Sequence, residues 1–189
     1  MAEEIKSEMD EKEGVLPEEE ALLDQITVTE EDSAQFPPDL ILDTQENYSD
    51  EQRQSMHQKI LYMSVPQKIR LALLGNREAR NILIQDRNKI ICLAVLRSPK
   101  LSENDVMSYA QSRNLPQEIF AQIGKSKRWT KYYPVKLALV NNPKTPLHIS
   151  LRFLDHLTER DLKGLSRNKN VSSVLNHSAG QILQKRGKH

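Results

Sequence analysis

The sequence has little of what covalent cross-links, metal cages and β-sheets require. Its 189 residues include one cysteine, Cys92, so a disulfide within the chain and a thiolate metal cage built from one copy are both excluded. Glycine is scarce, with six residues, and apolar and polar residues do not alternate as they do in strands. No apolar run approaches the roughly 18 residues of a membrane-spanning helix. We therefore expect an all-α chain that does not bind membranes.

Motifs that carry catalysis are also missing. The histidines show no metal-binding spacing such as H-E-x-x-H, and neither a glycine-rich phosphate loop nor a serine or cysteine nucleophile signature is present. These absences predict a protein that is not an enzyme and that holds no metal or cofactor. The opening MAEEIKSEMDEKEG is acidic and lacks the apolar core of a secretory signal. We expect a cytoplasmic location.

The charge that is present is divided unevenly along the chain. Residues 1–50 carry 17 acidic and two basic side chains, whereas residues 51–189 carry nine acidic and 25 basic ones. Residues 1–48 are rich in Glu, Asp, Ser, Pro and Gln and show no sustained period, a composition typical of disorder. The sequence therefore predicts a disordered acidic tail at 1–48 and a basic all-α domain at 49–189.

Two apolar islands interrupt the acidic tail, VLPEEEALLDQITV at 15–28 and FPPDLILD at 36–43. They are compatible with a solvated tail, or with a docking motif anchored by Leu40, Ile41 and Leu42. A third interpretation is that the tail contacts the basic domain of its own chain, because tethering keeps its effective concentration near the millimolar range.

The basic domain contains a repeated apolar segment. IRLALLGN at 69–76, ICLAVLRSP at 91–99 and VKLALVNNP at 135–143 share apolar positions spaced for one helix face, followed by a polar break. Cys92 occupies the variable position of its copy, so we expect its thiol near the rim. Further helices are predicted at 49–63, 77–85, 102–112, 115–124, 145–157, 158–166 and 170–186, from capping residues such as Ser49, Ser102, Thr145 and Thr158.

These segments predict a succession of helix pairs. In each pair, one copy of the apolar segment is followed by a second helix, so 91–99 pairs with 102–112 and 135–143 pairs with 145–157. The second and third copies are 44 residues apart, a period typical of helical-repeat arrays. The expected architecture is a short curved α-solenoid stabilised by nearest-neighbour stacking. In the closing helix, Val171, Val174, Leu175 and Ile182 are expected to face inward.

Across about residues 65–186, the sequence resembles the HEAT-like and leucine-rich-repeat-variant helical arrays of bacteria. The resemblance lies in LAVLRSPKLSENDVMSYA and LALVNNPKTPLHISLRFL, with their helix, Asn/Ser-Pro and helix pattern. It implies a function in binding proteins or nucleic acids rather than a reaction. Some variant arrays carry a cysteine-bound iron–sulfur cluster, a feature that does not extend to a chain with one cysteine.

Three basic connectors precede helical segments. They contain the candidate binding residues, which are Arg87 and Lys89; Lys125, Lys127, Arg128, Trp129, Lys131 and Tyr132; and Arg167 and Lys169. If the turns of the array align along one edge, these cations form a ladder suited to an acidic ligand. The same cations and asparagines also suit helix ends, where they offset the helix dipole and cap the helix.

The middle connector leaves two classes of ligand open. Basic residues interleaved with Trp129 and Tyr132 can bind nucleic acid through stacking and phosphate contacts, and they can equally form a protein-binding hot spot. A third interpretation is that the two aromatic rings fill a packing gap. Because no known nucleic-acid module is present, we favour an adaptor that recognises an acidic protein surface or segment, with the acidic tail regulating or docking. Nucleic-acid binding is the alternative.

Overall fold

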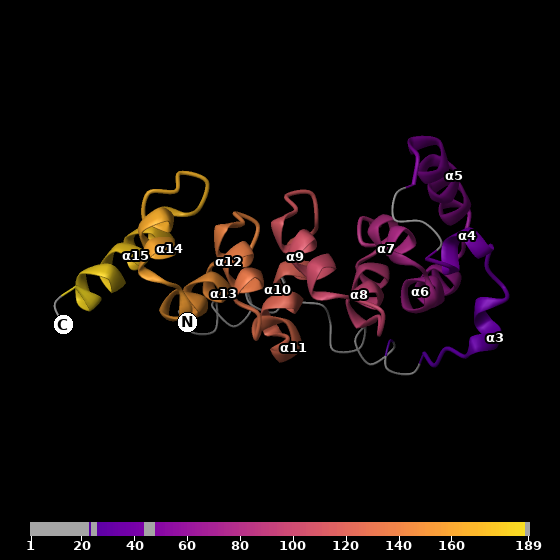
Figure 1. Ribbon diagram of the computed structural model, residues 1–189, viewed down its shortest axis with the longest axis horizontal. Helices are drawn as coiled ribbons and strands as arrows, with labels where there is room; N and C mark the ends of the chain where they lie inside the picture. Colours follow the sequence, from indigo (N-terminus) through magenta and orange to yellow (C-terminus); the bar gives the residue numbers. More distant parts are fainter. Residues whose placement is uncertain (1–22, 24–25, 44–47, 188–189) are drawn as a thin grey trace, which may run out of the picture. The chain divides into compact units, whose positions relative to one another are not determined.

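The computed structural model describes residues 23, 26–43 and 48–187. These residues form 13 α-helices and one 3-10 helix, and no strand occurs among them. The predicted all-α class is therefore confirmed. The chain divides into two compact units, Met1–Leu101 and Ser102–His189, and each is described here by itself (Figure 1).

The first unit begins its helices at local capping groups, as the sequence predicts. Ser49 Oγ accepts the Gln52 amide, and Asn76 Oδ1 accepts the Ala79 amide. Gly75 ends one helix where a Cβ atom would lie 2.5 Å from the Leu71 carbonyl oxygen. The helices are α3 (Glu30–Ser33), α4 (Pro38–Ile41), α5 (Asp50–Leu61), α6 (Val65–Leu74), α7 (Arg77–Leu83) and α8 (Lys89–Arg97).

Helices α6 and α8 lie side by side with their C-termini together. Ser98 Oγ donates to the Leu73 carbonyl at 3.2 Å, and Lys100 Nζ donates to the Leu74 carbonyl at 2.6 Å. Helix α7 runs antiparallel to α6, because the Lys68 ammonium at the start of α6 pairs with Asp86 just beyond α7 at 2.9 Å. Buried side chains of both repeated segments fill the space between the helices: Ile69, Leu71, Ala72, Ile91, Leu93, Ala94 and Val95.

Part of the predicted acidic tail belongs to this unit. Leu40 is fully buried, and α4 contacts both α6 and α7. Asn76 Nδ2 donates to the carbonyls of Asp39 and Leu42 at 2.7 and 3.0 Å, and the Lys59 ammonium pairs with Asp39 at 2.7 Å. Of the interpretations left open for this island, intramolecular contact is the one the geometry shows. The packed part of the first unit thus includes residues before 49; residues 1–22, 24–25 and 44–47 of the predicted tail lie outside the described residues.

Cys92 does not lie near the rim, and that prediction is wrong. The side chain is fully buried, and its Sγ atom lies 3.3 Å from the Ile84 carbonyl oxygen and 3.1 Å from that of Asp86. The reason is tertiary, because the chain leaving α7 covers this position of α8. The same position is half-buried in the other two copies, as Arg70 and Lys136.

The second unit contains the remaining elements, of which α11 and the 3-10 helix η1 are single turns. Gly124 lets two of its helices approach closely, since a Cβ atom there would lie 2.5 Å from Ile149 Cγ2. The elements are α9 (Glu103–Gln111), α10 (Gln117–Lys125), α11 (Lys127–Thr130), α12 (Tyr133–Asn141), α13 (Leu147–Phe153), η1 (Leu154–His156), α14 (Glu159–Leu165) and α15 (Ser173–Arg186).

Helices α9, α12 and α14 point the same way. Asn142 Nδ2, just after α12, donates to the carbonyls of Ala110 and Ser112 at the end of α9. Asn168 Nδ2, just after α14, donates to Asn141 Oδ1 at 3.1 Å. Helices α10, α13 and α15 return in the opposite direction, so the unit consists of three successive antiparallel hairpins (Figure 1).

The predicted pairing of helices is therefore wrong in one place. The sequence pairs α9 with α8, but the boundary between the units falls between Leu101 and Ser102. Instead, α9 packs along α12 and forms a hairpin with α10. Of the residues predicted to face inward in the closing helix, Leu175 is buried as expected, Val171 and Ile182 are half-buried, and Val174 is exposed.

The two copies that end in Ser-Pro-Lys and Asn-Pro-Lys share one structural device. Ser98 and Asn142 each reach back to carbonyls at the C-terminus of the neighbouring parallel helix. Lys100 Nζ also donates to a carbonyl at the end of α6, whereas Lys144 Nζ lies 3.4 Å from the Leu115 carbonyl oxygen in the loop that follows α9. The polar residues that end each copy thus cap the C-terminus of a neighbouring helix, where they satisfy carbonyls that have no partner within that helix.

Candidate binding surface

The middle connector presents its cations to solvent but not its tryptophan. Lys125, Lys127, Arg128 and Lys131 are exposed, whereas Trp129 is 5% exposed. The Arg128 guanidinium lies 4.1 Å from the centroid of the Trp129 ring, and the Lys131 ammonium lies 4.7 Å from that of half-buried Tyr132. The Trp129 ring is therefore packed inside the unit, and its outer face is covered by Arg128.

The end of the unit that holds this connector also gathers carboxylates. The Tyr133 hydroxyl at the start of α12 hydrogen-bonds Asp161 at the start of α14, and Arg186 Nη1 at the end of α15 donates to the Leu157 carbonyl. Hydrogen bonds from Tyr133 and then from Thr158 lower the pKa of Asp161. The helix ends at this side contribute Glu103, Asp105, Asp155, Glu159 and Asp161, so it carries charge of both signs.

The predicted ladder of connectors does not hold within the second unit. Lys125 to Tyr132 lie where α10 ends and α12 begins, whereas Arg167 and Lys169 follow the C-terminus of α14. These positions are at opposite ends of the parallel helices, as α11 and the loop after α14 show (Figure 1). The predicted ladder fails because the sequence pattern pairs α9 with α8, which places the turns between helices at the wrong ends. Arg87 and Lys89, both exposed, belong to the first unit.

A different set of cations shares one edge of the second unit. The loops 112–116, 142–146 and 166–172 all lie at the C-terminal ends of α9, α12 and α14, joined by the asparagine bonds described above. We call them the loop edge. Together they contain no Asp or Glu, and they expose Arg113, Lys144, Arg167 and Lys169.

Backbone polarity adds to the positive potential of the loop edge. Helices α10, α13 and α15 begin there, and helix N-termini carry a partial positive charge that favours anions. In the first turns of these helices the one acidic residue is Glu118 of α10. The loop edge is thus a nearly acid-free strip, in contrast to the mixed charge at the other end.

A groove of about 380 Å³ lies between α9 and α12 beside the loop edge. Met107, Leu137 and Ala138 contribute its apolar wall, and Gln111, Arg113 and Asn141 contribute polar groups. The arrangement can hold an apolar side chain while nearby cations pair with carboxylates. Sequence reasoning missed Arg113 and Lys144, although the Ser/Asn-Pro-Lys repeat contains Lys144.

The described residues offer no arrangement suited to a metal. No group of three His, Cys, Asp or Glu side chains among them could hold a metal ion. Cys92, the residue whose chemistry is most reactive in principle, is buried against backbone carbonyls.

Comparison with known protein families, curated proteins and solved structures gives no match to this chain. The likeness to HEAT-like arrays therefore stays an expectation from sequence. No helix in the described part of the chain is long and apolar enough to cross a membrane.

Proposed function

We propose that this chain is a non-enzymatic adaptor whose loop edge binds an acidic segment of a partner protein. The observation that carries the proposal is the strip of Arg113, Lys144, Arg167 and Lys169 in loops without carboxylates. The three hairpins of the second unit support a HEAT-like repeat, an architecture that usually presents protein-binding faces. The lone buried Cys92 suits a reducing compartment, which supports a cytoplasmic location.

A protein ligand fits better than nucleic acid because of the groove and the aromatics. The groove beside Arg113 has the apolar wall and amide groups that suit a peptide side chain and backbone. Sequence-tolerant binding of single strands needs exposed rings on which bases stack. The loops of the loop edge contain no aromatic residue, and Trp129 is buried. Nucleic acid is the second candidate, since four exposed cations along one edge can also contact phosphates.

Matched charge reversals test the loop edge. The test variant carries Arg113→Glu, Arg167→Glu and Lys169→Glu. The control variant carries Lys125→Glu, Lys127→Glu and Lys131→Glu at the opposite end, so both variants change the net charge by the same amount. The probe is a fluorescent synthetic peptide rich in Glu and Leu, followed by anisotropy. We expect the loop-edge variant to weaken binding by about tenfold or more. The control should retain most of the affinity, because charges beyond about 8 Å are screened at physiological salt.

Equal loss in both variants would reduce the effect to net charge and contradict the loop edge. The same variants with a labelled single-stranded oligonucleotide separate the two ligand classes. Four phosphate contacts predict that affinity falls roughly fiftyfold between 50 and 200 mM salt. An oligonucleotide that binds more tightly than the peptide, with that salt dependence, would favour the second candidate.

A further inference from the structure

An apolar patch lies exposed on the first unit, at the turn that joins α5 to α6. Leu61 is 59% exposed, Tyr62 is 88% exposed and Val65 is 43% exposed. They are three of the six large apolar side chains that are exposed in the described part of the chain. The other three, Leu42, Leu147 and Val174, are far apart in sequence. A cluster of this kind marks an interaction site more often than scattered single residues do.

Folding of the unit does not explain these side chains. The neighbouring Met56 and Ile60 of α5 and Ile69 of α6 are buried and supply the packing at this turn. The turn itself is closed by polar groups, since the Ser64 amide donates to Gln67 Oε1 at 2.9 Å. Leu61, Tyr62 and Val65 thus contact water at positions where polar residues would serve the fold equally well.

A cavity of about 230 Å³ opens beside the patch. Its apolar wall comes from Ile60 and Leu61 of α5 and from Ile82 of α7. The Lys68–Asp86 pair, with both side chains mostly buried, lines the polar side. The volume is several times the roughly 30 Å³ that one water molecule occupies in the liquid, so the cavity has room for an apolar side chain.

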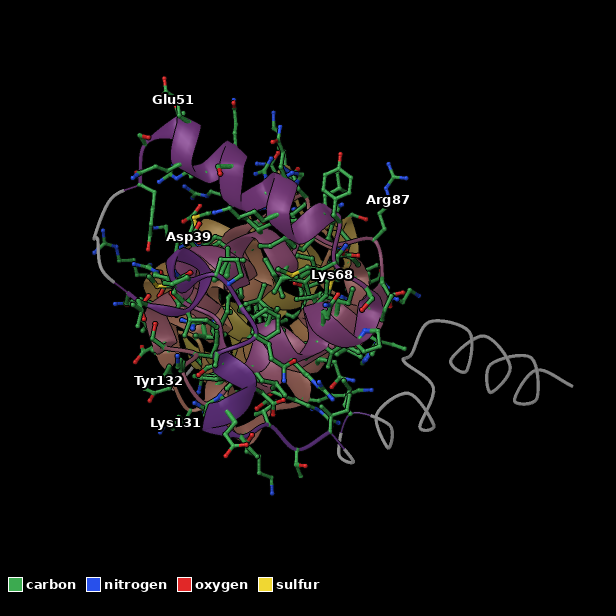
Figure 2. All side chains as sticks on the ribbon, turned by 90° about the vertical axis from the view of Figure 1, so that its right-hand side faces the viewer. Asp39, Glu51, Lys68, Arg87, Lys131 and Tyr132 are labelled. Atoms are coloured by element: carbon green, nitrogen blue, oxygen red, sulfur yellow. The ribbon has the colours of Figure 1, made fainter. Side chains whose placement is uncertain are left out.

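Charge around the patch identifies what fits it. Residues 57–68 contain no Asp or Glu, and Asp86 is already paired with Lys68. Arg87 is exposed. In Figure 2 it projects outward on the side toward which α5 runs from Glu51, whereas Lys68 lies nearer the middle of the view. A second copy docked patch to patch would place Arg87 near its own equivalent, whereas a segment with carboxylates meets opposite charge.

We propose that the α5–α6 turn and its cavity dock an apolar side chain from a partner-protein segment that carries carboxylates beside it. Tyr62 and Leu61 form the apolar centre, and Arg87 pairs with an acid at the rim. Aromatic and arginine side chains around an apolar centre are the usual composition of interface hot spots. This interface lies on the first unit and does not depend on the loop edge.

Peptide selection on the full-length chain tests the proposal. Short random peptides displayed on phage are selected on the full-length chain that carries the loop-edge reversals Arg113→Glu, Arg167→Glu and Lys169→Glu, so that binders of the loop edge are excluded. The peptides recovered are synthesised with a fluorescent label. The test variant is Leu61→Ser with Tyr62→Ser. The matched control, Leu147→Ser with Val174→Ser, changes two exposed apolar side chains of the second unit. Circular dichroism and thermal unfolding check that all variants fold. We expect them to fold because the four substituted side chains are exposed.

We expect peptides with an aliphatic or aromatic residue next to Asp or Glu. Their affinity should fall about tenfold or more in the test variant, the loss typical of hot-spot side chains, and also fall in Arg87→Glu. The control should bind like the original chain. Binders that lack acids, or that the test variant leaves unchanged, would overturn the proposal. So would a dimer of the full chain that the test variant dissociates, or displacement of the peptides by a synthetic peptide of residues 1–22.

Discussion

Single residues of this chain behave as their local chemistry predicts wherever the partner is close in sequence. Ser49, Ser102 and Thr158 accept the amides three residues ahead and start their helices. Thr145 is the exception, because its helix starts at Leu147 and its buried hydroxyl makes no hydrogen bond. The position of Cys92 is predicted wrongly because the thiol is covered by the chain leaving α7, which lies outside its own helix.

One pH-dependent prediction belongs to this scale. The Tyr133 hydroxyl is the main cause that lowers the pKa of Asp161 from the usual 3.8. Because the pKa of Asp161 is lower in the folded chain than in the unfolded chain, ionisation of this carboxyl stabilises the fold. The stabilisation is complete above the unfolded pKa of about 3.8 and is lost as the pH falls through the folded pKa. Tyr133→Phe should therefore lower the free energy of unfolding by about 1 kcal/mol at neutral pH. The difference from the original chain should shrink in acid.

Urea unfolding at neutral and acidic pH measures this difference, and an NMR titration of the Asp161 carboxyl follows its pKa. Tyr132→Phe is the control, since it removes a neighbouring hydroxyl from the same helix start. A Tyr133→Phe variant whose instability is the same at both pH values would show that packing, and not the bond to Asp161, is responsible.

At the scale of elements, helix positions follow from sequence, whereas the partner of one helix, α9, does not. The predicted 69–76, 91–99 and 135–143 correspond to α6, α8 and α12 with shifts of a few residues. Periodicity and caps fix these positions because both act over one or two turns. The partner of α9 depends instead on which faces meet in space. That partner is α12, as the bonds from Asn142 to the Ala110 and Ser112 carbonyls show.

The short helix α4 provides a prediction about an element. Leu40 is fully buried, while Leu42 two residues later is 52% exposed. Leu40→Ala should lower the free energy of unfolding by about 2–5 kcal/mol, because it leaves a cavity against α6 and α7. Leu42→Ala, the matched control, should change it by less than about 0.5 kcal/mol. Denaturant unfolding distinguishes them, and equal small effects would show that α4 is not part of the first unit.

For the whole molecule, the division between acidic and basic regions does not coincide with the division of the fold. Residues 26–43 are acidic yet packed on the first unit, with Asp32 3.7 Å from Arg70 and Asp39 paired with Lys59. Any regulatory role of the acidic tail therefore has to be tested on residues 1–22, whose removal spares these contacts.

Deleting residues 1–22 is the prediction at this scale. The segment carries nine acidic and two basic side chains, so the deletion raises the formal net charge from +1 to +8. We expect tighter binding of the acidic probe peptide, with the largest gain at low salt, where long-range attraction is strongest. Anisotropy titrations over a salt series measure it. Equal affinities of the full and shortened chains would contradict regulation by the acidic segment.

The sequence alone determined the helical class, most helix positions and the uneven distribution of charge. These properties depend on periodicity, capping and composition, which act on residues close together along the chain. Only the tertiary structure decided which turns share an edge. It placed Arg113 and Lys144 with Arg167 and Lys169 while sending Lys125 to Lys131 to the opposite end. Those neighbours meet through packing and hydrogen bonds between residues about 30 positions apart, a separation that local patterns do not encode.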